Sequence, residues 1–417
     1  MNKEKVGIIG LGYVGLPLAV AFARHYQVTG FDIDSQRVEE LKLGFDRTHE
    51  LTKEAISSVS SLLFTDQQAD ISNCTIYIVT VPTPLNPDKT PDLRFLINAS
   101  SMIGRVLKKN DLVIYESTVY PGCTEEECVP VLEEFSSLQY NRDFFVGYSP
   151  ERINPGDQTR KIEDIKKIVS GSTAATAIRV QQLYDAVITA GTYLAPSIKV
   201  AEAAKAIENA QRDVNISFMN ELALMFDKMG IDTGDVLEAA ATKWNFLPFR
   251  PGLVGGHCIG VDPHYLVHKA RAVGYEPRLI AAGREINDQM GVFVAEKMIA
   301  ALAKKKNGNI KGARVLILGF SFKENCSDTR NTKVIDIYQT LKKAGVNVFV
   351  QDPWVDHLNY LDVQFVEKTN DHQWDAVLLA IKHDMFKKAD FEELKNKGAL
   401  IFDTQGIIEK RFVDWRL

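Results

Sequence analysis

The sequence predicts an α/β protein of two doubly wound domains joined by a long central helix. In the first part of the chain, short β-branched and aliphatic runs alternate with helical patterns, and this alternation restarts near residue 314. Between the two regions, residues 197–230 carry no turn signal and are rich in alanine, leucine, methionine and glutamate. Alternating strands and helices are typical of βαβ units in a parallel sheet that is covered on both faces. We therefore expect domains at residues 1–196, 197–303 and 304–417.

The individual elements follow from these patterns. The expected strands of the first domain are buried apolar runs at 6–9, 27–31, 75–81, 112–116 and 144–147. The stretch at 197–230 predicts one long helix, which suits it to joining domains or to forming a dimer interface. A polar, lysine-rich stretch at 304–312 predicts a linker. The last domain is expected to hold strands at 314–318, 346–351, 376–381 and 400–402, with a helix over 333–344.

The composition is that of a soluble globular protein. Of 417 residues, 45% are hydrophobic and 25% are charged, and a net charge of −5 gives no reason to expect nucleic acid or membrane as a partner. Residues 6–23 are uncharged but contain four glycines and a proline, so a strand, a turn and a helix start explain them better than a membrane segment. Five scattered cysteines without CxxC spacing favour reduced thiols and a cytoplasmic location.

A glycine-rich motif directly follows the first expected strand. Gly10, Gly12 and Gly15 form GxGxxG, and they open an expected helix. This context is typical of a Rossmann-like turn, where a pyrophosphate rests on the helix N-terminus. Asp32 ends the second strand 22 residues after Gly10, where a carboxylate binds ribose hydroxyls and favours NAD over NADP. The alternative is a glycine turn that binds nothing.

Two threonines follow later strands of the same domain. Thr83 lies just beyond the expected strand at 75–81, and Thr118 just beyond the one at 112–116. Ligands of such sheets bind outside the carboxyl ends of the strands, so both side chains are expected to face the cofactor or the reacting carbon. Each threonine, taken alone, is more often an ordinary turn or cap residue.

The most unusual stretch is GGHCIGVDP, residues 255–263, which places Cys258 among glycines. A cysteine thiolate adds readily to an aldehyde, and Asp262 shares a face with Cys258 if a helical turn begins there. The alternative is that Cys258 is a buried structural thiol with no catalytic role. A metal site is a second alternative, with the candidate ligands His257, Cys258, Asp262, His264 and His268. No HExxH or CxxC motif supports it, so we expect no metal.

On the expected long helix, Lys205 and Asn209 are four residues apart. Residues at this spacing point the same way, so both side chains can hydrogen-bond one ligand oxygen. A solvated helix face is the alternative for any such pair.

Six ordered blocks resemble the UDP-glucose/UDP-mannuronic acid dehydrogenase family, and the resemblance extends over essentially the whole chain. The blocks are GLGYVGLPLA, YESTVYPG, GYSPERINPG, KAIENAQRDVNISFMNE, GGHCIGVD and GFSFKENCSDTRNT. The resemblance implies two Rossmann-like domains, a homodimer formed through the long helix, and a UDP-sugar substrate. It also implies a four-electron oxidation of the sugar C6 alcohol to a carboxylate, with two NAD⁺ consumed.

The resemblance assigns roles residue by residue. Cys258 matches the nucleophile that captures the aldehyde as a thiohemiacetal and then carries a thioester, and Glu151 matches the acid that works with water in hydrolysis. Lys205 and Asn209 match oxyanion-stabilising groups, and Asp262 supports proton handling. Thr118 is expected among the catalytic residues as well. The expected cofactor-binding residues are Gly10, Gly12, Tyr13, Val14, Gly15, Asp32, Arg37, Thr83, Thr118 and Arg330. The expected substrate-binding residues are Glu151, Arg152, Lys205, Asn209, Arg250, Gly255 and Lys323.

One departure bears on the substrate. Members that act on UDP-glucose usually read GGxCxPKD, whereas Val261 stands here in place of that lysine. The run NFLPFRPGLVGGHCIGVDP resembles instead the branch that oxidises UDP-N-acetylglucosamine or its C4 epimer UDP-N-acetylgalactosamine for surface polysaccharide synthesis, and Arg250 in it resembles an arginine that reaches a nucleotide sugar. The alternatives are a UDP-glucose or UDP-N-acetylmannosamine 6-dehydrogenase, a two-electron alcohol dehydrogenase with Lys205 as acid and base, and a non-catalytic nucleotide-sugar or NAD sensor.

Overall fold

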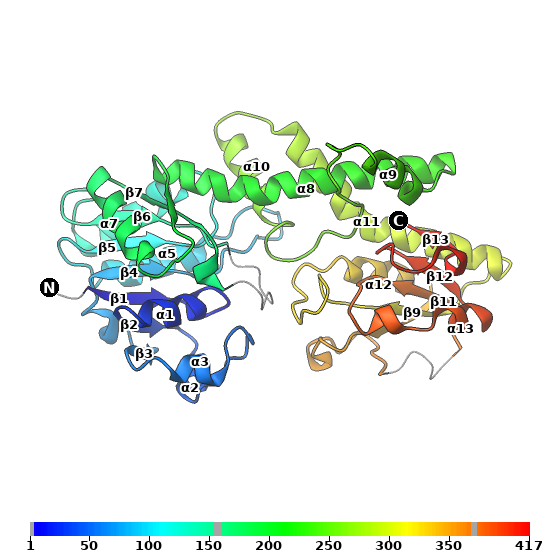
Figure 1. Cartoon of the computed structure of the whole chain (residues 1–417), viewed down its shortest axis with the longest axis horizontal. Helices are drawn as coiled ribbons and strands as arrows, with labels where there is room; N and C mark the ends of the chain where they lie inside the picture. The colour runs from blue at the N-terminus through cyan, green and yellow to red at the C-terminus, as the bar shows by residue number, and fades with distance from the viewer. Residues whose placement is uncertain (1–3, 153–160, 368–372) are drawn as a thin grey trace. The chain divides into compact units, whose positions relative to one another are not determined.

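A computed structural model describes residues 4–152, 161–367 and 373–417 of the chain (Figure 1). The chain divides into two compact units. The first unit comprises Met1–Glu208 and His264–Tyr275, and the second comprises Asn209–Pro263 and Glu276–Leu417.

The first unit is built on a sheet that, in the described residues, has eight strands in the order β3-β2-β1-β4-β5-β6-β7-β8. Its strands are β1 (Lys5–Ile9), β2 (Gln27–Phe31), β3 (Leu62–Thr65), β4 (Ile76–Val79), β5 (Leu112–Tyr115), β6 (Phe145–Tyr148), β7 (Lys167–Gly171) and β8 (Thr192–Leu194). The pairs from β3 to β6 are parallel, and β7 pairs with β6 in the antiparallel direction. The strand order reverses beside β1, which is where such sheets bind ligands.

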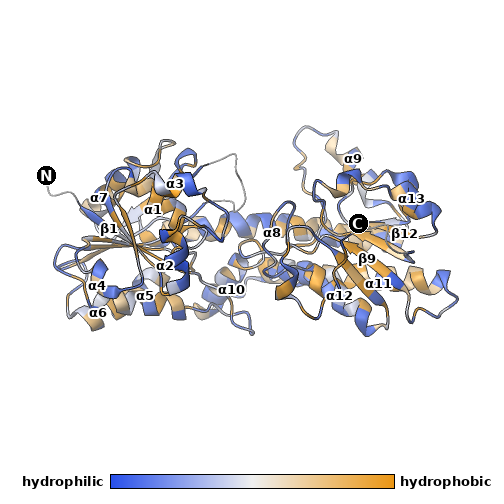
Figure 2. Cartoon of the chain, turned by 90° about the horizontal axis from the view of Figure 1, so that it is seen from below, coloured by the Kyte–Doolittle hydropathy of each residue, from blue (hydrophilic) through white to orange (hydrophobic). Residues whose placement is uncertain are grey.

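Helices cover the first sheet. They are α1 (Gly15–Ala23), α2 (Ser35–Lys42), α3 (Lys53–Ser57), α4 (Gln68–Ile71), α5 (Arg94–Gly104), α6 (Val129–Ser136) and α7 (Ala174–Asp185), with a π-helical turn at Thr124–Cys128 and a 3₁₀ turn at Ile162–Asp164. The buried core joins α1 to the strands and α7, and includes Leu16, Phe22, Ile78, Ile114 and Tyr184. Figure 2 shows hydrophobic residues concentrated along the strands.

The expected long helix is confirmed as α8 (Ile198–Met229), a continuous helix of 32 residues. Its sequence contains neither glycine nor proline, which explains why it is not interrupted. It is followed by α9 (Thr233–Ala241), α10 (Asp262–Ala272) and α11 (Arg278–Lys305). In the second unit, a buried ion pair between Asp213 and Arg284 joins α8 to α11. Because α11 runs to Lys305, the connection that follows it begins later than the predicted linker at 304–312.

The second unit holds a smaller parallel sheet, which in the described residues has five strands in the order β10-β9-β11-β12-β13. The strands are β9 (Arg314–Leu318), β10 (Asn347–Gln351), β11 (Ala376–Leu379), β12 (Leu400–Asp403) and β13 (Trp415–Arg416). The helices α12 (Val334–Lys343) and α13 (Phe391–Asn396) accompany them, with 3₁₀ turns at His357–Asn359, Phe386–Lys388 and Lys410–Phe412. The prediction of an α/β protein with two doubly wound domains is confirmed.

Each predicted strand is present in the structure, and no end differs from its prediction by more than two residues. The strand predicted at 75–81 ends earlier, as β4, because the Thr80 side chain turns back to donate a hydrogen bond to the Gly10 carbonyl at 2.8 Å. The strands β3, β7, β8 and β13 are not among the predictions. β8 and β13 have only three and two residues, and much of β8 is exposed, so neither carries the apolar run that identified the predicted strands.

The first turn of each sheet has the same construction. Gly10 and Gly319 follow the first strands with φ of +97° and +92°, and each amide donates to the end of the neighbouring strand at 2.8 Å. The next amide then donates to an acid beyond that strand, Leu11 to Asp32 at 2.8 Å and Phe320 to Asp352 at 2.6 Å. The second unit therefore repeats the strand, turn and acid arrangement without a GxGxxG sequence.

Asp352 is the buried anchor of the second turn. Its carboxylate also accepts hydrogen bonds from the amides of Ser321 at 3.0 Å and Trp354 at 2.9 Å, and from His383 Nε2 at 3.0 Å. Burial opposes ionisation of Asp352, but the hydrogen bonds from His383 and the amides outweigh it and lower its pKa.

We expect Asp352→Ala to lower the free energy of unfolding of the second unit by about 3–5 kcal/mol, because it leaves several buried donors unsatisfied. All four tryptophans lie in this unit (Trp244, Trp354, Trp374 and Trp415), so tryptophan fluorescence during urea unfolding measures the effect. Replacement of the exposed Glu392 by alanine is the control and should change stability by less than about 0.5 kcal/mol. An equally small effect of Asp352→Ala would contradict the anchoring role.

Candidate active site

The glycine turn of the first unit is packed against protein on one side and open on the other. A Cβ on Gly15 would overlap the Gly10 carbonyl oxygen and reach the Thr80 hydroxyl at 2.5 Å. A Cβ on Gly12 would meet nothing within 4 Å, and Gly12 is exposed. The helix α1 begins at Gly15, so its unpaired amides lie next to this open space. The turn therefore fits the close approach of a dinucleotide pyrophosphate.

Asp32 and Arg37 hold the turn from the neighbouring strand and helix. The Asp32 carboxylate accepts from the amides of Leu11 at 2.8 Å and Asp34 at 3.0 Å, and it is half-buried. Each carboxylate oxygen accepts more than one hydrogen bond, so Asp32 retains capacity for a hydroxyl ligand. Arg37 is buried, donates to the Leu11 carbonyl at 3.0 Å and pairs with Asp46 at 2.7 Å. The structure thus places Arg37 behind the turn.

Thr83 and Thr118, predicted at two strand ends, lie together. The Thr83 hydroxyl donates to the Thr118 carbonyl at 2.8 Å, and the Tyr265 hydroxyl donates to the Thr83 carbonyl at 2.5 Å. Tyr265 belongs to α10, whose Lys269 also forms an ion pair with Glu126 beyond β5 at 2.5 Å. The first turns of α10 are therefore attached to the loops that follow β4 and β5. Tyr265 is a contact that the sequence analysis missed.

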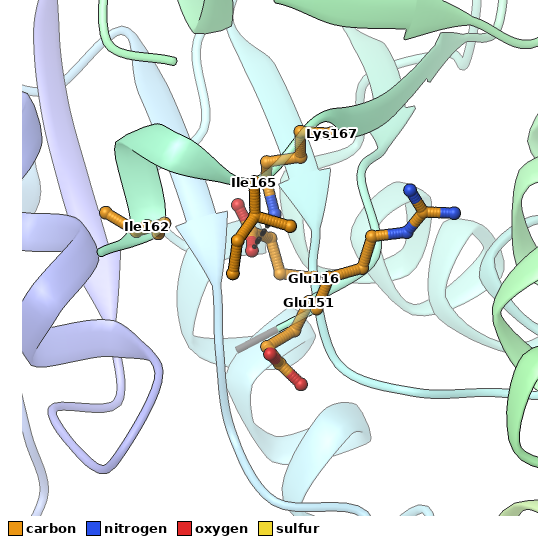
Figure 3. A pocket seen from close by; sticks show the side chains of 6 residues that line it. Glu116, Glu151, Ile162, Ile165 and Lys167 are labelled. Atoms are coloured by element: carbon orange, nitrogen blue, oxygen red, sulfur yellow. Dashed lines mark hydrogen bonds and ion pairs between the residues drawn. The ribbon is translucent and has the colours of Figure 1, made fainter. Parts of the chain in front are cut away.

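Glu151, which follows β6, lies close to Lys205 of α8. The Lys205 Nζ lies 3.8 Å from Glu151 Oε2, and their side chains are only 6% and 12% exposed. Arg152 pairs with Glu208 of α8 and donates to the Lys166 carbonyl at 3.0 Å. Glu151 lines a small cavity of about 10 Å³, and Figure 3 shows the side chains around it. Three residues predicted to contact substrate are thus brought together in the first unit.

The cysteine loop of the second unit is packed against the segment that follows β9. A Cβ on Gly255 would come within 2.8 Å of the Asn331 carbonyl, and a Cβ on Gly256 within 2.8 Å of the Phe322 ring. Gly256 has φ of +85°, and its amide donates to the Arg330 carbonyl at 3.1 Å. Only glycine allows this approach, which explains why two glycines precede the cysteine.

Cys258 differs from the other four cysteines, which are all buried (Cys74, Cys123, Cys128 and Cys326), because it is partly exposed. The Asp262 amide donates to the Cys258 carbonyl at 2.8 Å, so a helical turn leads into α10 as the sequence suggested. Asp262 is 2% exposed, and it accepts a hydrogen bond from Asn209 Nδ2 at 2.5 Å. The thiol therefore sits on a fixed turn, one turn before a buried carboxylate and amide pair.

A charged cluster surrounds His257, next to Cys258. The His257 Nδ1 lies 3.0 Å from Arg330 Nη2 and 3.2 Å from Asp328 Oδ2, while Arg330 also contacts Asp328 at 2.6 Å. Burial opposes ionisation of Asp328, but the hydrogen bonds from His257 and Arg330 hold its pKa well below its usual range. Sequence reasoning named Arg330 but missed Asp328, because no spacing rule connects residues 257 and 328.

The remaining predicted substrate residues lie in the second unit. Lys323 is half-buried beside the Phe322 ring, and Arg250 is exposed. The loop after Arg250 is fixed to α8, since Asn220 donates to the Gly252 carbonyl at 3.0 Å and accepts from its amide at 2.8 Å. Tyr13 and Val14 lie half-buried in the glycine turn of the first unit.

Within residues 4–152, 161–367 and 373–417, no group of three or more histidine, cysteine, aspartate or glutamate side chains is arranged to hold a metal ion. Among the helices of the described part, none is long and apolar enough to cross a membrane.

Comparison with known proteins matches three segments of the chain to one family. The NAD binding domain of the UDP-glucose/GDP-mannose dehydrogenase family matches residues 4–188, its central domain 199–289 and its UDP binding domain 316–410. These matches and the open glycine turn define an NAD-dependent oxidoreductase. The chain belongs to the UDP-glucose/GDP-mannose dehydrogenase family, and the resemblance inferred from its six motifs is confirmed.

Individual relatives cover the whole length. The chain is 52% identical over 423 residues to UDP-N-acetyl-D-glucosamine 6-dehydrogenase of Pseudomonas aeruginosa, with 100% of both chains covered. It is 32% identical to UDP-N-acetyl-D-mannosamine dehydrogenase of Pyrococcus horikoshii, covering 97% of this chain and 96% of the relative. A solved UDP-glucose dehydrogenase from Pyrobaculum islandicum has a TM-score of 0.88 and 25% identity, covering 100% of this chain and 97% of that one.

The two faces of the glycine turn give opposite expectations for two alanine substitutions. Gly15→Ala should lower the unfolding free energy by about 1–3 kcal/mol or more, because its methyl group overlaps the turn itself. Gly12→Ala should leave the stability of the cofactor-free protein unchanged but weaken NAD⁺ binding roughly tenfold, a change of about 1.4 kcal/mol.

Thermal unfolding without cofactor and isothermal titration with NAD⁺ measure the two effects. The interpretation of the turn fails if Gly12→Ala unfolds as easily as Gly15→Ala, or if it binds NAD⁺ as tightly as the unaltered protein.

Proposed function

We propose that the protein is a UDP-N-acetyl-D-glucosamine 6-dehydrogenase, which oxidises the C6 alcohol of the sugar to a carboxylate with two NAD⁺. The observation that carries the proposal is the 52% identity, over the full length of both chains, to an enzyme with that name. The identity to a UDP-N-acetyl-D-mannosamine dehydrogenase is only 32%. Val261, in place of the lysine usual in UDP-glucose members, supports the same choice of branch. UDP-N-acetylgalactosamine, the C4 epimer of UDP-N-acetylglucosamine, is the alternative substrate within the same branch of the family.

The cofactor is proposed to bind at the glycine turn. Bound NAD⁺ supplies the hydride acceptor for both oxidation steps. The amides at the start of α1 and the open space at Gly12 hold the pyrophosphate, and Asp32 binds the ribose hydroxyls. Thr83 and Thr118, linked by their hydrogen bond, lie at the carboxyl ends of β4 and β5, where they contact the cofactor.

Cys258 is proposed as the covalent nucleophile. The C6 alcohol first loses a hydride and a proton to become an aldehyde. The Cys258 sulfur then adds to the aldehyde carbon, and the resulting thiohemiacetal loses a second hydride and a proton to become a thioester. Attack by water releases the uronate and regenerates the thiol. The partial exposure of Cys258, unlike that of the four buried cysteines, supports this role.

The polar residues of the site divide the remaining tasks. Lys205 and Asn209 carry donors that stabilise the oxyanions formed at C6, and Asp262, hydrogen-bonded to Asn209, accepts and returns protons. Glu151 activates the water that hydrolyses the thioester. Its Oε2 lies 3.8 Å from the Lys205 ammonium.

The second unit is proposed to hold the UDP portion of the substrate. The residues assigned to this role are Gly255, Lys323 and Arg250, and Arg152 of the first unit is assigned to the same ligand. Arg330 is assigned to the cofactor, and it also lies beside His257 and Asp328 at the cysteine loop.

We further propose a cytoplasmic homodimer that supplies a uronic acid for surface polysaccharide. Exposed apolar side chains along α8 support a dimer interface there: Val200, Ile207, Phe218, Met225 and Met229 are 45–59% exposed. Free cysteines support a reducing compartment.

Cys258→Ser should reduce uronate formation at least roughly 10³-fold, in the range typical of nucleophile removal, while NAD⁺ and UDP-sugar still bind. The unaltered enzyme should release two NADH per uronate formed, whereas a two-electron dehydrogenase would release one. NADH absorbance together with product quantification measures both numbers. Cys74→Ser is the control with normal turnover, and undiminished uronate production by Cys258→Ser would refute the covalent role.

A panel of UDP-sugars tests the substrate. We expect kcat/KM for UDP-N-acetylglucosamine or UDP-N-acetylgalactosamine to exceed that for UDP-glucose by at least roughly 10²-fold, because a site built to hydrogen-bond the acetamido group is left unpaired without it. NADH release with product identification by mass spectrometry gives the ratio. Activity restricted to UDP-glucose would exclude the proposed branch.

A further inference from the structure

A buried ion pair lies directly behind Glu151, at the edge of the first sheet where the parallel strands have their carboxyl ends. Lys167, the first residue of β7, contacts Glu116, the residue after β5, at 2.7 Å (Figure 3). Their side chains are 5% and 0% exposed, so both charges are removed from water. Tyr184 of α7 donates its hydroxyl to the other oxygen of Glu116, and the Lys167 ammonium lies 5.3 Å from the Tyr184 ring.

The pair also fixes the backbone that leads into Glu151. The Lys167 ammonium donates to the Pro150 carbonyl at 3.0 Å and lies 3.5 Å from the Ser149 carbonyl. The Glu151 amide in turn donates to the Glu116 carbonyl at 3.4 Å. Lys167 and Glu116 therefore hold the two residues before Glu151 and the amide of Glu151 itself.

Glu151 and the pair also share one cavity. The cavity of about 10 Å³ is lined by Glu116, Glu151, Arg152 and Lys167 together with two isoleucines, Ile162 and Ile165. This volume fits about one water molecule. Arg152, which lines the cavity, has its Nε buried without a hydrogen-bond partner among the described residues. A change in the pair is thus transmitted to Glu151 both through the backbone and through the cavity.

Stability alone does not explain the pair. A buried ion pair is often matched or exceeded in stability by apolar residues of the same volume, since the desolvation of two charges offsets their attraction. The surroundings already include apolar side chains such as Ile162, Ile165 and the Tyr184 ring. A charged pair retained here at 5% and 0% exposure therefore indicates a requirement for defined geometry.

We propose that Lys167 and Glu116 are positioning residues for Glu151, and that they act on the hydrolysis of the thioester and not on the two hydride transfers. This inference rests on the proposed function, in which Glu151 activates water. A displacement of a catalytic group by about 1 Å typically costs about 10²-fold in rate. Loss of the pair should therefore slow the release of product while substrate binding and oxidation continue.

The test uses Lys167→Met in the full-length enzyme with UDP-N-acetylglucosamine and NAD⁺. Rapid mixing should show a burst of two NADH per active site, followed by steady-state turnover slowed roughly 10–100-fold with little change in KM. Intact-protein mass spectrometry should detect the acyl-enzyme during that phase. Added hydroxylamine, which attacks the thioester without an activated water, should restore turnover and give the hydroxamate of the uronic acid. A purely structural role would not produce this rescue.

Two companion variants keep the result interpretable. Lys167→Met leaves Glu116 as an uncompensated buried charge, so the double variant Lys167→Met with Glu116→Gln is the one to use if the single variant does not fold. Arg179→Met removes a different ion pair of the same unit, which joins α7 to Glu4 at 2.7 Å, and should hydrolyse the thioester at the normal rate.

The variant Glu151→Gln distinguishes a failure of the positioning role of Lys167 and Glu116 from a failure of the proposed function. If it accumulates acyl-enzyme while folded Lys167→Met or the double variant does not, the positioning role is wrong and the proposed function stands. A uniform slowing of burst and steady state in the Lys167 variants would overturn the positioning role as well. If Glu151→Gln accumulates no acyl-enzyme either, the proposed role of Glu151 in hydrolysis fails, and the positioning role with it.

Discussion

The parallel register of β1, β4, β5 and β6 is the constraint on which the chemistry of the first unit depends. Ile9 pairs with Val79, Val79 with Tyr115, and Tyr115 with Tyr148, so all four strands end at the same level. The residues that follow these ends must then leave the sheet side by side. The segments that follow these strand ends contain the glycine turn, Thr83, Glu116, Thr118 and Glu151. These residues are spread over about 140 residues of sequence. Backbone hydrogen bonds, and not side-chain contacts, thus bring them to one edge.

The two sheets use the same first turn for different tasks, and the burial of one acid explains the difference. Asp32 is half-buried and receives two backbone hydrogen bonds, which leaves acceptor capacity toward solvent. Asp352 is 2% exposed, and its oxygens are engaged by three amides and His383. Because Asp352 is buried and three of these hydrogen bonds fall on its Oδ2, the carboxylate is not accessible to a ribose hydroxyl. The match of the first unit to an NAD binding domain and of the second to a UDP binding domain agrees with this difference.

Local patterns in the sequence predict the elements and motifs that depend on neighbours along the chain. Gly10, Gly12, Gly15 and the long helix α8 belong to this group, because a turn or an uninterrupted helix is encoded within a few residues. Arg37 shows the limit, since local patterns do not indicate that its guanidinium is buried against Asp46. The pairs Lys167–Glu116 and His257–Asp328 depend on contacts 51 and 71 residues apart. Spacing rules for helices and strands carry no information at such separations.

An enzyme that oxidises twice and then hydrolyses must keep water from reacting at C6 until the thioester exists, and then use it. A fixed acid is a better solution than a mobile one, because a carboxylate that reaches C6 early would hydrate the aldehyde. In the proposed route, Glu151 would meet this need through contacts on three sides: the Lys205 ammonium at 3.8 Å, the backbone held by Lys167, and the cavity shared with Arg152. If the proposed positioning role holds, the charges buried behind Glu151 are the cost of holding one carboxylate in one place while the sugar carbon changes its oxidation state.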